Sequence, residues 1–226
     1  MKYRDKLIDY FSNIQEGTVV IANDLYEAQF TKMSQDAFFR AMERLADDGE
    51  IIRISKGLYI RKEDATKDRT EILLNYYFGE DNAQGMFIGY QLYNKYQLTS
   101  VKSDKYELLS NLSRAGVSRI GNITVKRPAV SLTFENARII EALEIFQNYY
   151  DIEELDKMKF ARYAKQFARG YEDAAAVTVI RSMNYKKSTI AFMKKILDMY
   201  KISNSLSSFL SYASDYKIPT VQKIAR

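Results

Sequence analysis

The feature that most restricts the fold is a change within the first sixty residues from helical to strand-like periodicity. The apolar positions of the first expected helix are Tyr3, Leu7, Tyr10, Phe11 and Ile14. This run ends near Gly17 and is followed by a short apolar stretch over residues 19–21. Asn23 is a favourable N-cap for a short second helix that contains Leu25 and Tyr26. The chain therefore begins with two helices joined by a short extended segment.

A third helix and a hairpin complete the pattern. The helix is expected to begin after the N-cap residue Ser34 and to stop at Gly49. Its apolar stripe consists of Ala37, Phe38, Ala41, Met42 and Leu45. Two β-rich runs, residues 51–54 and 58–60, flank the turn at residues 55–57 and predict a hairpin. This is the order of a winged helix-turn-helix, so we expect residues 1–64 to form such a domain and to bind double-stranded DNA.

The side of the third helix that faces away from the apolar stripe carries the candidate DNA contacts. These residues are Gln35, Asp36, Phe39, Arg40, Glu43 and Arg44. Gln35 and Arg40 suit base edges because each can form two hydrogen bonds with one base. Phe39 either touches a thymine methyl group or packs under the second helix. The basic residues expected at phosphates precede the helix or follow it in the hairpin, at Lys32, Arg53, Lys56 and Arg61.

The charge of the chain is uneven. The formal net charge is +5, but residues 1–64 hold 10 basic and 12 acidic residues, whereas residues 151–226 hold 14 and 8. An acidic segment binds DNA only if its carboxylates point away from the groove, as we expect for Asp47, Asp48 and Glu50 at the far end of the third helix. The alternative is a winged helix that serves as a protein–protein interaction module, with Arg40 and Arg44 as solvated surface.

The rest of the chain is expected to form one domain, residues 65–226, with a small α+β unit followed by an all-helical part. Helices are predicted over residues 69–77 and 86–96, a strand over 106–110, and a hairpin around Gly121 and Asn122. Thr133 can cap a further helix whose apolar positions are Ile139, Leu143, Phe146 and Tyr150. The charged residues 62–68 indicate the domain boundary, and residues 79–85 the hinge. The fold class predicted for the whole chain is α+β.

The C-terminal helices predict separate apolar and basic faces. Between residues 156 and 171, Arg162, Lys165 and Arg169 lie opposite an apolar face. A later helix carries Lys194 and Lys195 beside its own apolar residues. These basic faces either bind DNA backbone, RNA or an acidic protein, or they are the solvated side of a helical bundle.

The composition excludes several classes of enzyme. The chain contains no His and no Cys, which removes Ser-His and Cys-His nucleophiles and nearly every type of zinc site. The acidic clusters at residues 47–50 and 151–156 fit helix ends better than a metal-dependent nuclease. We therefore expect a non-enzymatic protein without a metal or cofactor. No apolar run approaches the ~20 residues of a membrane span, and the N-terminus does not resemble a signal peptide, so a cytoplasmic location is expected.

The stretch from Ser34 to Tyr59 resembles the winged-helix domain of AbiEi-type antitoxins, which typically reads RALxRLxxxGxIxRIxRGxY. The matching positions are Arg40-Ala41, Arg44-Leu45, Gly49, Ile51, Arg53-Ile54, Gly57 and Tyr59. Met42 and Lys56 stand where the pattern has Leu and Arg. Residues 89–99, 105–111 and 132–136 are similar to later segments of the family, so the resemblance covers most of residues 1–150. Residues 151–226 match no family motif position by position.

The resemblance implies a function that cannot be derived from the composition. AbiEi-type antitoxins repress their own operon by binding repeats in its promoter. They also counteract a nucleotidyltransferase toxin, as type IV toxin–antitoxin pairs in phage defence, and need not form a stable complex with it. The resemblance therefore implies promoter DNA and a toxin as partners, with an antitoxin role in the C-terminal domain.

Overall fold

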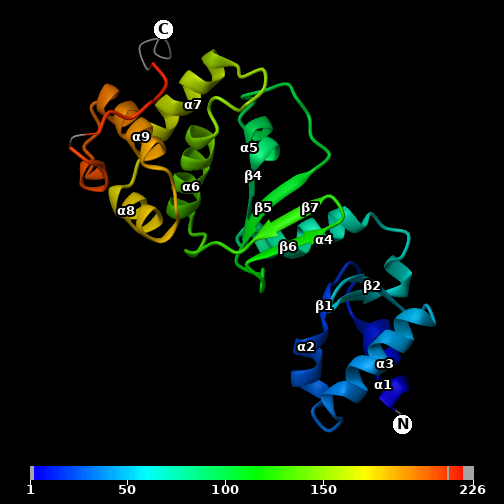
Figure 1. Cartoon of the computed structure of the whole chain (residues 1–226). Helices are drawn as coiled ribbons and strands as arrows, with labels where there is room; N and C mark the ends of the chain where they lie inside the picture. The colour runs from blue at the N-terminus through cyan, green and yellow to red at the C-terminus, as the bar shows by residue number, and fades with distance from the viewer. Residues whose placement is uncertain (1–2, 213, 221–226) are drawn as a thin grey trace. The chain divides into compact units, whose positions relative to one another are not determined.

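The computed structural model describes residues 3–212 and 214–220 (Figure 1). Within these residues the chain forms nine α-helices and two small sheets, which confirms the predicted α+β class. It divides into two compact units, of which the first ends at Tyr77 and the second begins at Phe78. No helix in the described ranges is both long enough and apolar enough to span a membrane.

The first unit combines helices with a three-stranded antiparallel sheet of order β1-β3-β2. Its elements in chain order are α1 (Tyr3–Asn13), β1 (Val20–Ile21), α2 (Ala22–Leu25), a π-helical turn (Tyr26–Phe30), α3 (Gln35–Asp47), β2 (Ile51–Ser55), β3 (Leu58–Arg61), a 3-10 turn (Lys62–Asp64) and α4 (Arg69–Phe78). The hairpin β2–β3 pairs Ile51 with Arg61 at its base and Ser55 with Leu58 at its tip. The predicted sequence of helices and hairpin is therefore present.

A single apolar cluster holds this sheet together with α1, α2, the π-helical turn and α3. Leu7 and Phe11 of α1 and Phe38 of α3 are almost completely buried in it. The ring of Phe38 lies 5.4 Å from that of Phe30 and 5.3 Å from that of Tyr26. Side chains of this size remove large apolar areas from water, so they fix the angle at which α3 crosses the other helices.

The second helix differs from the prediction. The residue that precedes it is Ile21, which offers no side-chain cap, and the predicted cap Asn23 lies inside the helix. After Leu25 the helix continues as the π-helical turn, which ends at Phe30. The hydroxyl of Tyr26 donates a hydrogen bond to the carbonyl of Met33 at 2.9 Å and so holds the connection to α3. Phe30, the last residue of the π-helical turn, is buried in the core.

The charged stretch predicted as the domain boundary is part of the first unit. Asp64 is fully buried, and it accepts hydrogen bonds from Gly17 N at 2.9 Å and from Arg61 Nε at 3.0 Å. Lys67 pairs with Asp64 and with Glu16. Charge density indicated the domain boundary here, but these charges neutralise one another within the first unit, and the division between the units lies between Tyr77 and Phe78, at the last residue of α4.

The sheet of the second unit is mixed. Its strands are β4 (Gly85–Ile88), β5 (Tyr106–Ser110), β6 (Val117–Ile120) and β7 (Ile123–Lys126), in the order β4-β5-β7-β6. Strands β5 and β7 are parallel, and the other pairs are antiparallel. The hairpin at Gly121 and Asn122 is as predicted. The helix predicted over residues 86–96 is wrong in its first part, because Met86 and Ile88 belong to β4 and the helix starts at Gly89, where φ is +62°.

Five helices complete the second unit. They are α5 (Gly89–Lys95), α6 (Phe134–Gln147), α7 (Lys157–Arg169), α8 (Asp173–Ser182) and α9 (Lys187–Met199). Helices α7, α8 and α9 lie around α6 (Figure 1). Phe146 of α6 contacts Phe160 and Phe167 of α7 and Phe192 of α9. Thr133 caps α6 as predicted, whereas Tyr150 lies beyond its end and is exposed. A 3-10 turn (Leu206–Phe209) follows α9.

Candidate nucleic-acid interface

Helix α3 turns one side toward the core and the other toward solvent. Its start is fixed by Ser34, whose Oγ accepts a hydrogen bond from the backbone N–H of Ala37 at 3.4 Å. Phe38, Met42 and Leu45 form the buried side. Because these three side chains orient the helix, the residues opposite them face water whatever their chemistry.

The exposed side of α3 holds most of the residues predicted to contact DNA. Those that are exposed are Gln35, Asp36, Arg40, Glu43 and Arg44. In the described part of the chain, neither Arg40 nor Arg44 forms an ion pair with a carboxylate. A guanidinium group carries five donors and no acceptor, so both side chains are available to an external acceptor.

Two residues in the first turns of α3 are placed differently from the prediction. Phe39 is half-buried against the apolar cluster, and its ring makes an edge contact with the neighbouring Phe38 at 5.4 Å. Ala37 was predicted in the buried stripe but is exposed, because the core ends before this side of the first turn. Ala37 therefore lies on the same exposed side as Arg40 and Arg44, at i, i+3 and i+7. Its methyl group suits contact with a thymine methyl.

The tip of the β2–β3 hairpin exposes one predicted phosphate contact. Lys56 is exposed at the turn, and it makes no ion pair with any described residue. Gly57 follows it with φ of +75°, a backbone conformation that favours glycine in a tight turn. The turn thus fixes the backbone and leaves the Lys56 side chain in solvent.

Arg53 is exposed to solvent, but it also lies close to residues of opposite charge. It lines a depression of about 410 Å³ together with Glu43, Asp47 and Arg69. Burial raises the pKa of the Tyr59 hydroxyl, Arg53 acts against this rise, and the two carboxylates add to it. All three charges therefore act on the same hydroxyl group. Arg53 thus shares a depression with two acidic residues of α3 but forms no ion pair with either of them, an arrangement that the sequence did not indicate.

Arg61 is not available for the predicted phosphate contact. Only 19% of its side chain is exposed, and its Nε donates to Asp64 Oδ2 at 3.0 Å. One Nη donates to the carbonyl of Ile14 at 3.4 Å, and the other lies 3.6 Å from Glu16 Oε2. Its donors are committed inside the unit, so Arg61 is a structural residue, and we remove it from the set of expected DNA contacts.

Lys32 precedes α3 on the connection from the π-helical turn. It is exposed, and it lines a groove of about 780 Å³ beside Lys6 and Tyr10 of α1 and Gln29. Lys32 and Lys6 thus contribute two positive charges to one groove, and Asp9 contributes one negative charge. The phosphate contact predicted for Lys32 requires a DNA backbone that passes this groove at the start of α3.

The acidic residues at the far end of α3 are partly neutralised. Asp48 forms an ion pair with Arg4 of α1 at 2.8 Å, and Glu50 forms one with Lys62 at 2.9 Å. Both pairs lie beyond the last turn of the helix, away from Gln35. The ranges that the structure describes contain no cluster of three acidic side chains suited to a metal ion. Asp48 and Glu50 are therefore each matched by one basic residue.

Comparison with known proteins adds little to this geometry. No family model matches the chain, and no curated protein matches its sequence. Among solved structures, the chain is similar to the crystal structure of the Rv2827c protein from Mycobacterium tuberculosis. The TM-score is 0.44 and the sequence identity 12%, over 87% of this chain and 76% of that chain. Function is therefore argued from the residues themselves.

The sequence interpretation missed the group that organises the base of this surface. Asp64 was expected at the domain boundary because of the charge density there, yet hydrogen bonds from Gly17 and Arg61 fix it inside the unit. The spacing of Arg61, Asp64 and Lys67, three residues apart in each case, was the available signal, because such residues meet on one side of a helical turn. Arg69, beside Arg53, was also missed.

Proposed function

We propose that the first unit is a winged helix-turn-helix that binds double-stranded DNA in a sequence-specific manner, with α3 in the major groove. The observation that carries the proposal is the solvent-facing row of Ala37, Arg40 and Arg44 on a helix whose opposite side is locked into the core. A methyl group and unpaired guanidinium groups on one rigid helix face are the chemistry that reads base edges.

In this proposal the β2–β3 hairpin is the wing. Lys56 at its tip supplies a phosphate contact, which fixes the orientation of α3 without reading sequence. Lys32 supplies a second such contact at the start of α3. Glu43 and Asp47 face Arg53 in their shared depression, which reduces the repulsion between these carboxylates and DNA.

The resemblance to AbiEi-type antitoxins extends the proposal to a biological role. In that role the chain represses its own operon through promoter repeats and counteracts a nucleotidyltransferase toxin, in the cytoplasm and without an enzymatic activity of its own. This part rests on the family pattern from Arg40 to Tyr59. A neighbouring gene for a nucleotidyltransferase, and rescue of cells that express it by this chain, would test the role directly.

A binding measurement tests DNA recognition itself. Fluorescence anisotropy should be recorded with labelled duplexes that tile the region upstream of the gene, against a shuffled duplex of equal composition. We expect one duplex to bind at least tenfold more tightly than the shuffled control, with an affinity that falls as salt rises. Equal affinity for all duplexes would contradict sequence reading. Absence of any duplex binding at low salt would favour the protein–protein interaction module.

A further inference from the structure

A polar pocket lies on the second unit and is lined by residues of β5, β6 and β7. Glu107 of β5, Thr124 of β7 and Arg119 of β6 are register partners, so they form one row across three strands. The same row continues to Ile88 of β4, which is buried under the helices. The row therefore passes from the core into solvent, and its polar part forms the floor of a pocket of about 880 Å³.

The loop that borders this pocket is irregular but firmly held. It joins α5 to β5, and the side-chain amides of α5 bind its carbonyls. Gln91 Nε2 donates to the carbonyl of Ser103 at 3.0 Å, and Asn94 Nδ2 donates to that of Val101 at 2.9 Å. From the hairpin turn, Asn122 Nδ2 donates to the carbonyl of Asp104 at 2.6 Å. A loop with its carbonyls bound in this way presents its side chains from a fixed backbone.

Three cations from separate segments line this pocket. Lys102 and Lys105 come from the held loop, and Arg119 comes from β6. None of the three forms an ion pair with a carboxylate among the residues that the structure describes. Asp104 and Glu107 also line the depression, so its three positive and two negative formal charges sum to +1. Because the three cations form no ion pair with any described residue, the depression favours an anion with several oxygen atoms.

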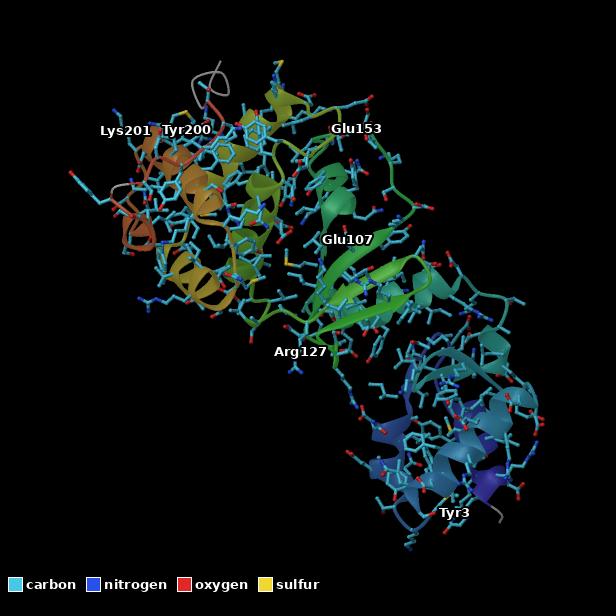
Figure 2. The ribbon with its side chains drawn as sticks, viewed as in Figure 1. Tyr3, Glu107, Arg127, Glu153, Tyr200 and Lys201 are labelled. Atoms are coloured by element: carbon cyan, nitrogen blue, oxygen red, sulfur yellow. The ribbon has the colours of Figure 1, made fainter. Side chains whose placement is uncertain are left out.

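Two carboxylates, Asp104 and Glu107, and an aromatic ring also line the pocket. Glu107 lies on β5 next to α5 (Figure 2). Its Oε2 is so close to Gly89 that a Cβ at that position would lie 2.7 Å from it, and its Oε1 is 3.9 Å from Lys126 Nζ. Tyr90 also lines the pocket, and its ring makes an edge contact with Tyr93 at 5.6 Å. The pocket thus joins an anion site to a hydrogen-bond acceptor and a π surface.

We propose that this pocket binds a mononucleotide. Lys102, Lys105 and Arg119 take the phosphate, Glu107 accepts hydrogen bonds from ribose hydroxyl or base amino groups, and Tyr90 contacts the base. An inorganic anion alone would place its negative charge beside the Glu107 carboxylate. A ligand that carries hydrogen-bond donors next to its phosphate binds both the cations and Glu107. The volume of about 880 Å³ lies in the range of pockets that enclose small molecules. The site is separate from α3 and does not depend on DNA binding.

Calorimetric titration of the full chain with the four ribonucleoside 5′-monophosphates tests this proposal, with the unphosphorylated nucleosides and inorganic phosphate as comparators. We expect at least one mononucleotide to bind, and inorganic phosphate and nucleosides to bind about tenfold more weakly or worse. No binding of any mononucleotide at a few millimolar would overturn the proposal. Inorganic phosphate binding as tightly as every nucleotide would also overturn it.

Matched variants locate the site. Arg119→Gln should weaken the best nucleotide about tenfold or more, because a charge-assisted hydrogen bond is lost. Arg162→Gln removes the same charge from the exposed side of α7, outside the pocket, and should leave the affinity unchanged. Amide NMR shifts of Asn122 and Thr124 upon titration provide a second readout. Equal affinity of Arg119→Gln and the wild type, with no shift at these amides, would place binding elsewhere and reject the assignment.

Discussion

Helices α3 and α7 have the same length, 13 residues, and similar packing, but they carry very different charges. Each begins at a side-chain N-cap, Ser34 or Asp156, and each buries one apolar side. Yet α3 carries three acidic and two basic residues, and α7 carries five basic residues and no acidic one. On charge alone, α7 would be the better DNA-binding helix.

The difference teaches that affinity for a polyanion and recognition of a sequence need different surfaces. On α7, Arg162, Lys165 and Arg169 form a uniform exposed row, which attracts any phosphate backbone equally. On α3, a methyl group and guanidinium groups alternate with carboxylates, which offers donors and acceptors at separate places. Mixed charge is therefore compatible with base reading, and it lowers non-specific attraction.

Loss of the buried aromatic side chain of α3 should have the largest effect. Phe38→Ala removes a fully buried ring and should lower the free energy of unfolding by about 3–5 kcal/mol, with loss of DNA binding. Phe160→Ala is the matched change in α7, and it should destabilise the second unit by a similar amount. Urea unfolding followed by amide NMR in each unit measures both. Destabilisation of both units by either variant would contradict independent cores.

Replacement of the buried carboxylate of the first unit should have the next largest effect. Asp64→Asn leaves Arg61 and Lys67 with only the exposed Glu16 as a charged partner and should cost about 2–4 kcal/mol. Burial alone would raise the pKa of Asp64, but hydrogen bonds from Gly17, Arg61 and Lys67 outweigh it and hold the pKa below its usual value. No buried carboxylate of this kind anchors α7, whose N-cap Asp156 is partly exposed.

The pH dependence of this effect has a defined sign. Because the pKa of Asp64 is lower in the folded than in the unfolded state, its stabilisation is complete above the unfolded pKa of about 4 and is lost as pH falls through the folded pKa. Urea unfolding between pH 7 and pH 3 should therefore show the wild type approaching Asp64→Asn on the acid side. A constant difference between the two proteins would rule out this linkage.

An Arg-to-Ala change on each helix tests the comparison most directly. Arg40→Ala should cost about 1–3 kcal/mol on the preferred duplex and much less on a shuffled one. Arg162→Ala on α7 should change the affinity for both duplexes by the same small amount. Fluorescence anisotropy on the two duplexes measures the four values. Equal losses for Arg40→Ala on both duplexes would mean that α3 contacts only the backbone.

The smallest effect is expected at the hairpin tip. Lys56→Ala removes a proposed phosphate contact and should weaken all duplexes alike, by less than about 1 kcal/mol near physiological salt. The slope of log affinity against log salt should fall by about 0.9. Affinity measured at several salt concentrations checks the slope, and an unchanged slope would remove the hairpin from the proposed interface.

The long helices could be predicted from sequence because local signals decide them. Ser34 and the stripe from Phe38 to Leu45 define α3 without reference to any other segment. The run from Met86 to Ile88 was wrongly predicted as helix, because a short apolar stretch has no decisive period, and its strand state depends on pairing with β5.

Contacts between distant segments explain what the sequence could not reveal about the sites. From the sequence, Arg61 was expected to be an available residue of the wing. In the fold it is bound by Ile14 and Glu16, which are distant from it in sequence. The pocket on the second unit had no sequence signal, because strand register alone brings Glu107 and Arg119 together. Charged residues of the same type can thus either be bound inside the fold or be available to a ligand, and only the fold distinguishes the two cases.

The hydrogen bond from Gly17 to Asp64 has a practical consequence for studies of the first unit. It links the segment after α1 to the segment after the hairpin, so it closes the chain into a loop of which α3 is the middle. A shortened protein that ended at Arg61 would retain every proposed DNA contact but lose this closure. Truncations for binding or NMR experiments should therefore extend past Lys67, which pairs with both Asp64 and Glu16.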